Sequence, residues 1–416
     1  GCLIMERAPS VVPLEREEVL PGALVAALLL GLLGVALGRP VLALVAFSVA
    51  TVLALALLWR RFGFAHVRYR RVVDPPRAFP GETVTLSLVI ENAKPLPLPW
   101  VEVVEEVPAA LALPGVPLGP SPKPERKVLR TLLAVGAAER VVRRYTGRAV
   151  RRGVFRFGPA QLTTGDPFGL ARARLDVEPG TTLLVYPEIR PVDSFGLPAE
   201  RPLGDAAPLR PLLDDPLRIQ GVRPYQPGDS PRQIHWRATA RLGALQTRLL
   251  ERTAAPALAL FLDVNTFEHF WEGIRPGELE WAISLTASLA AWGIDQGFPV
   301  GLWANAPLIG GERVVRVPPS RHPRQLERVL EALAMLVPHT GHRIETLLAS
   351  EARLLPRGAT LVVVTALVTD PLRRTLLALW RQGYGIALLA VACEAGLPAR
   401  RGLAVYELEA DGALAR

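Results

Sequence analysis

The sequence predicts a three-part fold: an N-terminal two-helix transmembrane hairpin, a β-sandwich-like middle domain, and a C-terminal α/β domain with a doubly wound, mainly parallel sheet. Three observations predict it. Two long uncharged runs precede residue 60, short alternating runs broken by Pro and Gly follow, and strand-like and helix-like runs alternate towards the C-terminus. A chain of 416 residues suits two or three domains. We assign residues 1–62 to the N-terminal tail and hairpin, 63–189 to the β-rich domain and 256–416 to the α/β domain. Residues 190–255 are a linker with a dense motif between the last two.

The hairpin is predicted from two runs without any charged residue, which we expect to form helices over about 21–38 and 41–59. Each is close to the roughly 20 apolar residues that cross a bilayer core as a helix. Gly38-Arg39-Pro40 is the short connection between them and requires an antiparallel pair. A cleaved signal peptide is the alternative, but two apolar spans in tandem and the acidic residues between Glu15 and Glu18 argue against it.

The basic residues predict which side of the membrane the chain occupies. Only Arg39 lies in the tight turn, whereas several arginines follow the second run directly: Arg60, Arg61, Arg68, Arg70 and Arg71. By the positive-inside rule, everything after about residue 60 is expected in the cytoplasm. The net charge of +9 comes almost entirely from arginine. We favour attraction to an anionic membrane surface over nucleic acid as its meaning, and expect no nucleic-acid partner.

The middle domain is predicted from period-two alternation. Thr83–Glu91 and Trp100–Val107 alternate apolar and polar residues as half-buried strands do, and Pro-rich or Gly-rich stretches separate the runs. Repeated short strands of this kind favour a β-sandwich. Asp166-Pro-Phe-Gly is expected to be a turn. We expect three aromatic side chains of this domain to pack in its core: Trp100, Phe155 and Phe168.

The C-terminal domain is predicted from a change in the sequence pattern to alternating strand-like and helix-like runs. Ala257–Val264 and Thr360–Thr365 are continuous apolar runs typical of buried strands, and helix-like runs over 277–296 and 370–382 follow them. Such alternation favours a doubly wound sheet. Residues 190–215 are rich in Pro, Asp and Gly without periodicity, so we expect a linker or an ordered loop there.

Known catalytic signatures are missing from the sequence. It contains no Gly-rich phosphate loop ending in Lys, no GxGxxG after the strand at Ala257, no His-Glu-x-x-His and no GxSxG. His339 and His342 are the only close pair of histidines, with Glu345 as the nearest carboxylate, and a solvated helix start explains them better than zinc. We therefore expect no catalytic residue, no cofactor and no metal centre.

The end of the first α/β strand requires a closer test. Asp263 follows the strand, and a carboxylate there with two hydroxyl residues at alternate positions is how von Willebrand factor A domains hold Mg²⁺. Here Asn265 replaces the first hydroxyl residue and Phe267 the second, and the strand ending at Thr365 lacks the expected Asp. The sequence therefore predicts a von Willebrand factor A-like sheet with a degenerate site at Asp263 and Asn265.

The densest cluster of charged and aromatic residues is the segment 221–241. Its Pro-Gly-Asp is a turn signal, and a short helix is expected to begin at residues 229–231 and to stop at Gly243. Asp229 and Arg232 would pair on it, and Ile234 and Trp236 would pack inward. Two roles stay open: a surface that recognises an acidic partner, or a buried Arg–Asp network that locks the linker onto the α/β domain.

The residues of this segment resemble the signature of the domain-of-unknown-function family numbered 58. That family has Arg-x-Tyr-x-x-Gly-Asp, then Arg-x-Ile-x-Trp, then an Ala-Arg pair. Arg151-Arg-Gly-Val-Phe-Arg-Phe-Gly-Pro and Asp166-Pro-Phe-Gly-Leu are similar to a second family pattern. The candidate structural or partner-binding residues are Arg223, Tyr225, Gly228, Asp229, Arg232, Ile234, His235, Trp236, Thr239 and Arg241.

The resemblance implies a membrane-anchored, non-enzymatic adaptor in the inner (cytoplasmic) membrane of a bacterium. It would bind a MoxR-type AAA+ ATPase and serve protein maturation, assembly or envelope stress. This implication rests on analogy of fold and neighbourhood. The alternative is a hydrolase-like enzyme at the C-terminal edge of the α/β sheet. It would require Asp229, His235 and Asp263 to converge.

Overall fold

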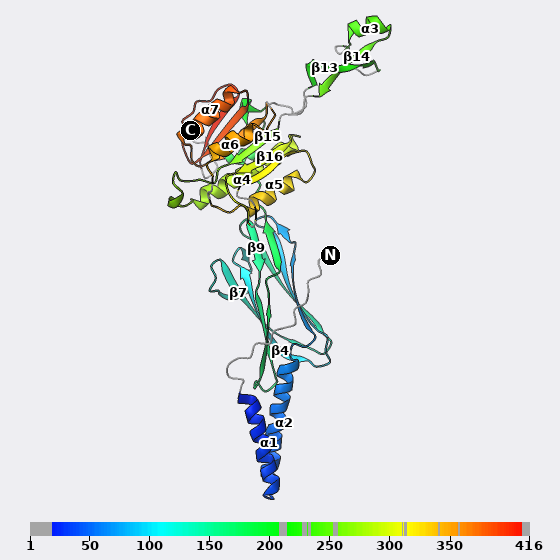
Figure 1. Cartoon of the computed structure of the whole chain (residues 1–416), viewed down its shortest axis with the longest axis vertical. Coiled ribbons are helices and arrows are strands. Elements are labelled where there is room, and N and C mark those ends of the chain that lie inside the picture. The colour runs from blue at the N-terminus through cyan, green and yellow to red at the C-terminus, as the bar shows by residue number, and fades with distance from the viewer. Residues whose placement is uncertain are drawn as a thin grey trace. The chain divides into compact units, whose positions relative to one another are not determined.

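The computed structural model describes residues 19–207, 214–226, 231, 234–252, 257–309, 311, 314–339, 342–356 and 358–409 (Figure 1). The chain divides into two compact units, Gly1–Tyr186 and Pro187–Arg416. The apolar hairpin therefore shares a unit with the β-rich middle part, and the signature segment shares the other with the α/β part.

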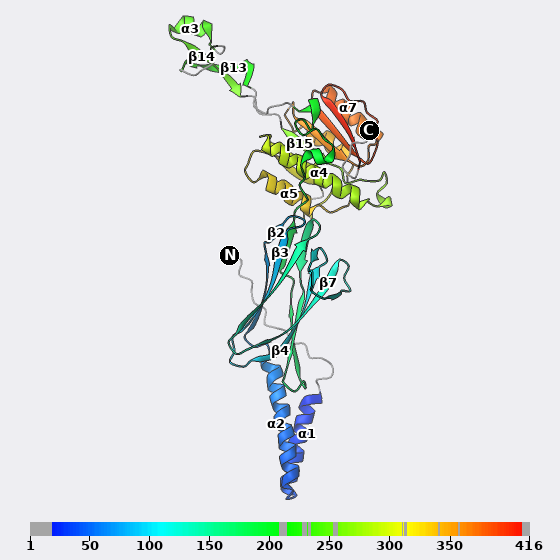
Figure 2. The same ribbon diagram turned by 180° about the vertical axis from the view of Figure 1, so that it is seen from behind.

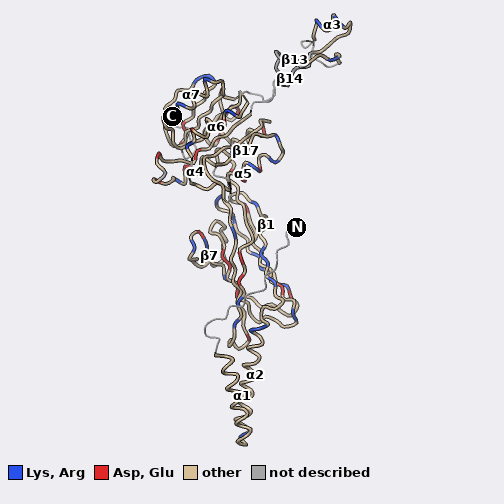
Figure 3. The backbone as a smooth tube through the Cα atoms, in the orientation of Figure 1, with Lys and Arg blue, Asp and Glu red and all other residues tan. Residues whose placement is uncertain are grey.

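Two apolar helices form the hairpin, as predicted: α1 (Val19–Ala36) and α2 (Pro40–Phe62). Their mean hydropathies of 2.4 and 2.8 and their lengths are sufficient to cross a membrane. The helices pack closely, because a Cβ on Gly34 would lie only 2.8 Å from the backbone nitrogen of Ala43. Both helices are tan over most of their length in Figure 3, since charge gathers only in the last turn of α2 at Arg60 and Arg61.

The middle part is β-rich. Its strands form sheets in the orders β1-β3-β8-β5, β11-β10-β4-β7-β6 and β2-β12-β9. Alternate residues such as Val84, Leu86 and Leu88 on one strand, and Val101 and Val103 on another, are buried in a common core. The strands are β1 (Val67–Asp74), β2 (Arg77–Ala78), β3 (Thr83–Asn92), β4 (Leu98–Pro108), β5 (Leu111–Ala112), β6 (Leu118–Pro120), β7 (Arg126–Val135), β8 (Arg140–Ala149), β9 (Gly153–Phe157), β10 (Ala160–Gly165), β11 (Arg172–Val177) and β12 (Thr181–Val185).

One of the three aromatic side chains expected in this core lies outside it. Phe155 packs against the core and Trp100 is half-buried, but Phe168 is 60% exposed at the turn between β10 and β11. The prediction of core packing is therefore wrong for Phe168. Asp166 forms the turn by accepting hydrogen bonds from the backbone nitrogens that follow it, and this leaves the Phe168 side chain outside.

A buried ion pair crosses the same core. Arg71 Nε lies 2.7 Å from Glu105 Oε1, and the Tyr69 hydroxyl donates to Glu105 Oε2 at 2.6 Å. Arg71 Nη1 also donates to the carbonyl oxygen of Phe157. Burial raises the pKa of Glu105 to about 7, while the Arg71 charge opposes that rise.

The α/β part contains a mixed six-stranded sheet of order β17-β16-β15-β18-β19-β20. Figure 2 shows this part from behind, with β15 and the helices α4, α5 and α7 labelled. Neighbouring strands are parallel except β17, which is antiparallel to β16. Its strands are β15 (Leu258–Leu262), β16 (Val300–Ala304), β17 (Val315–Ser320), β18 (Thr360–Thr365), β19 (Gly385–Val391) and β20 (Leu403–Leu408). The helices are α4 (Pro276–Asp295), α5 (Gln325–Met335), α6 (Ile344–Ala352) and α7 (Asp370–Arg381), with a 3-10 turn η4 (Phe270–Glu272).

Every residue of β15 is buried, so both faces of this strand are covered. Ala259 and Phe261 pack with side chains of α6 and α7, such as Leu348 and Leu372. Leu258 points to the opposite face, where α4 approaches so closely that a Cβ on Gly293 would lie 2.6 Å from it.

The segment 190–255, expected as a linker or loop before a short helix, contains more regular structure than the sequence indicates. Its elements are the 3-10 turns η1 (Val192–Phe195) and η2 (Gly204–Ala206), the strands β13 (Asp214–Pro224) and β14 (Gln246–Arg252), and the helix α3 (Trp236–Leu242). The helix begins at Trp236, after the expected start at residues 229–231.

Candidate functional site

The signature residues that the structure describes lie on or between β13, α3 and β14, which together we call the signature element (Figure 1). β13 and β14 are antiparallel, and Arg223 pairs with Thr247. The backbone nitrogen of Tyr225 donates to the carbonyl oxygen of Leu245 at 2.9 Å. An antiparallel pair therefore fixes the two ends of the segment that contains α3.

Two signature residues fix α3 through side-chain hydrogen bonds. His235 precedes the helix, and its Nδ1 accepts a hydrogen bond from the backbone nitrogen of Ala238 at 3.0 Å. This satisfies one of the free N–H groups of the first turn. Thr239 Oγ1 accepts from the backbone nitrogen of Gln246 at 3.0 Å and so ties the helix to β14. The helix ends at Gly243, as predicted, where φ is +68°.

The structure separates the apolar signature residues by burial. Ile234 is buried and forms a β-bridge with Thr247, as inward packing requires. Trp236 is 66% exposed, so the inward packing expected for it is wrong. Arg223 and Tyr225 are half-buried, and Arg241 is exposed. Gly228, Asp229 and Arg232 lie outside the described residues, so the expected Asp229–Arg232 pair stays a prediction.

Sequence reasoning missed that Trp236 is one of several exposed apolar side chains on this element. Among the side chains of this element that the structure describes, the other large exposed ones are Val222, Leu242 and Leu245. Arg237 and Arg241 are exposed beside them in the sequence. The signal that could have found them is the brevity of the element, since one short helix on a two-stranded sheet can bury few side chains.

The second candidate position is the carboxyl end of β15. The Asp263 carboxylate is buried, and protein donors surround it. Oδ1 accepts from Asn305 Nδ2 at 2.7 Å and from the backbone nitrogen of Asn265 at 3.0 Å, and Oδ2 lies 2.9 Å from Thr365 Oγ1. Burial raises the pKa of Asp263 to about 6, against the lowering effect of these hydrogen bonds.

These hydrogen bonds bear on the metal site that the sequence predicts to be degenerate. The Asn305 amide, which follows the neighbouring strand β16 and was missed in the sequence, donates to the carboxylate oxygen that a cation would need. Asn305 also donates to the carbonyl oxygen of His342. Within the described ranges, no group of three or more His, Cys, Asp or Glu side chains could hold a metal ion. The residues at this edge thus suit a hydrogen-bonded carboxyl group better than a cation.

The hydrolase hypothesis required Asp229, His235 and Asp263 to converge. His235 Nδ1 is occupied by the Ala238 backbone nitrogen, whereas the Asp263 oxygens are bonded by Asn265, Asn305 and Thr365. Asp229 lies outside the described residues. Two of the three side chains therefore belong to separate hydrogen-bond networks. His339 and His342 are both exposed.

Comparisons with known proteins identify a family and a relative. The model of a family described as "Protein of unknown function DUF58" matches residues 221–414, which include the whole described signature after Gly221. The uncharacterized protein YeaD of Bacillus subtilis is 22% identical over 233 residues, covering 56% of this chain. The match covers 54% of YeaD, so the chain spans about half the length of this relative.

Solved structures show only remote likeness. A cohesin module from Clostridium perfringens has 13% identity and a TM-score of 0.21, and the match covers 29% of this chain and 95% of that one. A cohesin from Archaeoglobus fulgidus has 13% identity and a TM-score of 0.19, over 28% and 91% of the two chains. The alpha-2-macroglobulin of E. coli has 16% identity and a TM-score of 0.21, over 29% and 9%. Likenesses this low carry no argument.

Proposed function

We propose that this chain, which belongs to the DUF58 family of unknown function, is a membrane-anchored, non-enzymatic adaptor that binds a MoxR-type AAA+ ATPase. The observation that carries the proposal is the exposure of Trp236 on the signature element. A large aromatic side chain in water costs free energy that a protein interface recovers, and tryptophan is among the residues that contribute most to such interfaces.

Membrane anchorage is supported by α1 and α2, whose length and hydropathy fit two spans. Arg60 and Arg61 in the last turn of α2, against Arg39 alone in the turn between the helices, favour an orientation with residues after about 60 in the cytoplasm. The membrane would be the inner membrane of a bacterium. Both units would then be exposed to cytoplasmic proteins.

The chemistry of the signature element fits a protein partner with an apolar pocket and an acidic rim. Trp236, Leu242 and Leu245 offer apolar area, and Arg237 and Arg241 offer positive charge. Interfaces commonly combine a buried aromatic anchor with arginine contacts around it. An acidic surface on the ATPase would also accelerate association.

For the α/β part we infer a doubly wound, von Willebrand factor A-like scaffold. In the sheet order β16-β15-β18-β19-β20, neighbouring strands are parallel, and both faces of β15 are covered. Both observations support that inference. Asp263 is bonded by Asn305 and Thr365, which supports binding of the partner without a bridging cation.

Site-specific photo-crosslinking in native membranes tests the adaptor function. A photoreactive phenylalanine analogue replaces Trp236 in one variant and Trp271 in a control, because Trp271 is 69% exposed in the same unit. We expect a covalent adduct with the ATPase from position 236 and none from position 271. No adduct from position 236, or equal adducts from both, would reject the signature element as the docking surface.

A further inference from the structure

The turn between β10 and β11 is held rigidly by one buried carboxylate. Asp166 accepts from the backbone nitrogens of Ala171 at 2.8 Å and Phe168 at 3.2 Å, and its own backbone nitrogen donates to the Ala171 carbonyl at 3.2 Å. Gly169 has φ of +74°, a conformation that glycine adopts without steric cost. The conformation of the turn is therefore fixed from within and does not depend on packing by Phe168.

This rigid turn presents apolar side chains to its surroundings. Phe168 is 60% exposed, and Pro167 and Leu170 are exposed beside it. A turn between two strands does not require apolar residues, since polar residues and glycine form such turns equally well. The exposed phenylalanine and leucine therefore need another explanation. Their exposure on a preformed tip indicates a contact outside the folded unit.

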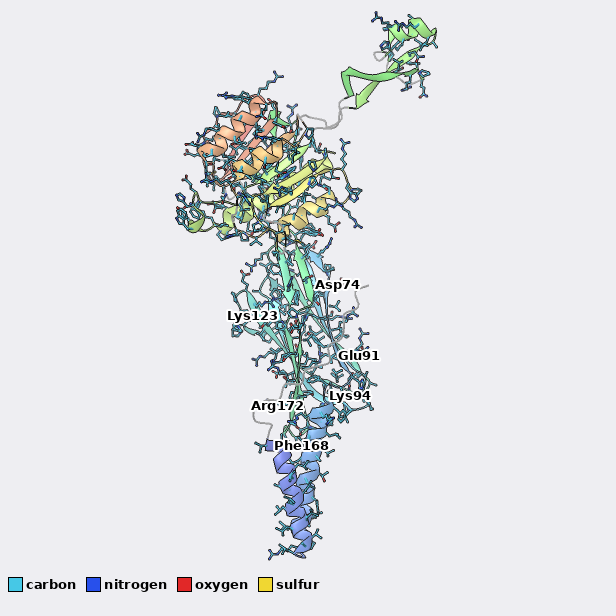
Figure 4. The ribbon with its side chains drawn as sticks, in the orientation of Figure 1. Asp74, Glu91, Lys94, Lys123, Phe168 and Arg172 are labelled. Carbon is cyan, nitrogen blue, oxygen red and sulfur yellow. The ribbon has the colours of Figure 1, made fainter. Side chains whose placement is uncertain are left out.

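The place of the turn identifies that contact. The strands that lead to it pack on the end of α2: a Cβ on Gly63 would lie 3.3 Å from Thr164 Cγ2 and 3.2 Å from Ala173 Cβ. From another side, Lys94 Nζ donates to the carbonyl oxygens of Phe62, at 3.1 Å, and Gly63. Figure 4 shows Lys94, Phe168 and Arg172 together at the end of the β-rich part that α2 enters. The tip thus lies beside the C-terminal end of α2, the second candidate span.

Other side chains at this level also suit lipid. Leu55, Leu58 and Phe62 of α2, with Leu96 of the loop after β3, line an open cavity of about 310 Å³ whose surface is apolar. Arg60, Arg61 and Arg172 supply positive charge at the same end of the unit. Apolar side chains flanked by arginine are typical of segments that lie at the boundary between headgroups and acyl chains of an anionic bilayer.

We propose that the Asp166–Leu170 turn is a third membrane contact, which inserts Phe168 and Leu170 into the headgroup region of an anionic phospholipid bilayer beside α2. The proposal rests on the membrane anchorage proposed above. With two helices alone, the β-rich part could pivot about the end of α2. The additional contact at the tip fixes its inclination to the membrane surface.

The test uses the full chain, with Cys2 and Cys393 replaced by Ser, reconstituted singly in nanodiscs of phosphatidylcholine and phosphatidylglycerol. An environment-sensitive fluorophore is attached in turn to Phe168→Cys, Val150→Cys and Leu44→Cys. Val150 is the matched control, since it is 58% exposed and directly follows the last residue of β8. The first residue of β8, Arg140, pairs with Glu91 at the other end of the strand. That separation is about 30 Å along the strand. The label at position 44, within α2, reports whether this helix lies in the bilayer.

We expect lipids with a quencher near the headgroup to reduce the fluorescence at position 168 at least twofold and to leave position 150 unchanged. Position 44 should be quenched by lipids that carry the quencher deep in the acyl chain. Equal responses at 168 and 150, with position 44 quenched, would overturn the membrane contact while anchorage stands. An unquenched position 44 would overturn both. A blue-shifted but unquenched label at 168 would mean that protein covers the tip, which also rejects the proposal.

Discussion

Replacing Asp263 by Asn should stabilise the protein at neutral pH and remove part of its pH dependence. Burial raises the pKa of Asp263 from its ordinary value of 3.8 to about 6 in the folded state. Between those pH values the unfolded chain carries the charge while the folded protein keeps the proton. The free energy of unfolding therefore falls as pH rises through this window. The loss amounts to about 3 kcal/mol, since each pH unit corresponds to about 1.4 kcal/mol.

The hydrogen-bond network can accept the substitution. In the Asp263→Asn variant, the new amide oxygen would still accept from Asn305 Nδ2 and from the backbone nitrogen of Asn265. The new amide nitrogen would donate to Thr365 Oγ1, whose own proton goes to the carbonyl oxygen of Leu367 at 2.8 Å. Every polar group at the site thus keeps a partner, so the expected cost of the exchange itself is small.

The assay is urea unfolding of the full chain in detergent at pH 4, 5, 6 and 7.5, for the wild type and for Asp263→Asn. Subtracting the two curves cancels the titration of Glu105, which both proteins share. We expect the variant to be the more stable by up to about 3 kcal/mol at pH 7.5, with the difference fading towards pH 4. A variant that is less stable at pH 7.5, with wild-type stability that rises on adding Mg²⁺, would refute the structural role given to Asp263.

Three further changes probe the first unit and the signature element. Arg71→Met leaves the Glu105 carboxylate buried without its partner. We expect urea unfolding to show that the free energy of unfolding falls by about 3 kcal/mol above pH 7 and by less at pH 5, where Glu105 is protonated. Equal decreases at both pH values would contradict a charged Glu105 above pH 7. Burial lowers the pKa of Lys94 to about 8, so the free energy of unfolding should rise between pH 8 and pH 10 in the wild type but not in Lys94→Met, as thermal scans at these pH values would reveal. Trp236→Ala should change the free energy of unfolding by less than about 0.5 kcal/mol, because the side chain is exposed; a larger loss would mean that Trp236 supports the fold.

The elements that the sequence predicted best are those with strong local patterns. The two helices follow from runs without charge, and β15 and β18 follow from continuous apolar runs. β13 was missed because Gly221 and Pro224 interrupt its apolar pattern. Its partner strand β14 is separated from it in the sequence by α3. Pairing between strands distant in the sequence leaves no periodic signal within either one.

The environment of the candidate residues was harder to predict than their identity. Asp263 was singled out, but its donors Asn305 and Thr365 are 42 and 102 residues away and meet it only in the folded sheet. Phe168 and Trp236 were expected to be buried because aromatic residues usually are. Both lie in short segments, a turn and a seven-residue helix, where local hydrogen bonds hold the backbone without help from the side chain.

Equilibrium binding of a purified MoxR-type ATPase to the full chain in nanodiscs tests the adaptor function most directly. The wild type and the control Trp271→Ala should bind with the same Kd, and Trp236→Ala should bind at least about tenfold more weakly, which corresponds to about 1.4 kcal/mol. Equal Kd values for wild type and Trp236→Ala, or no binding by the wild type, would contradict the account.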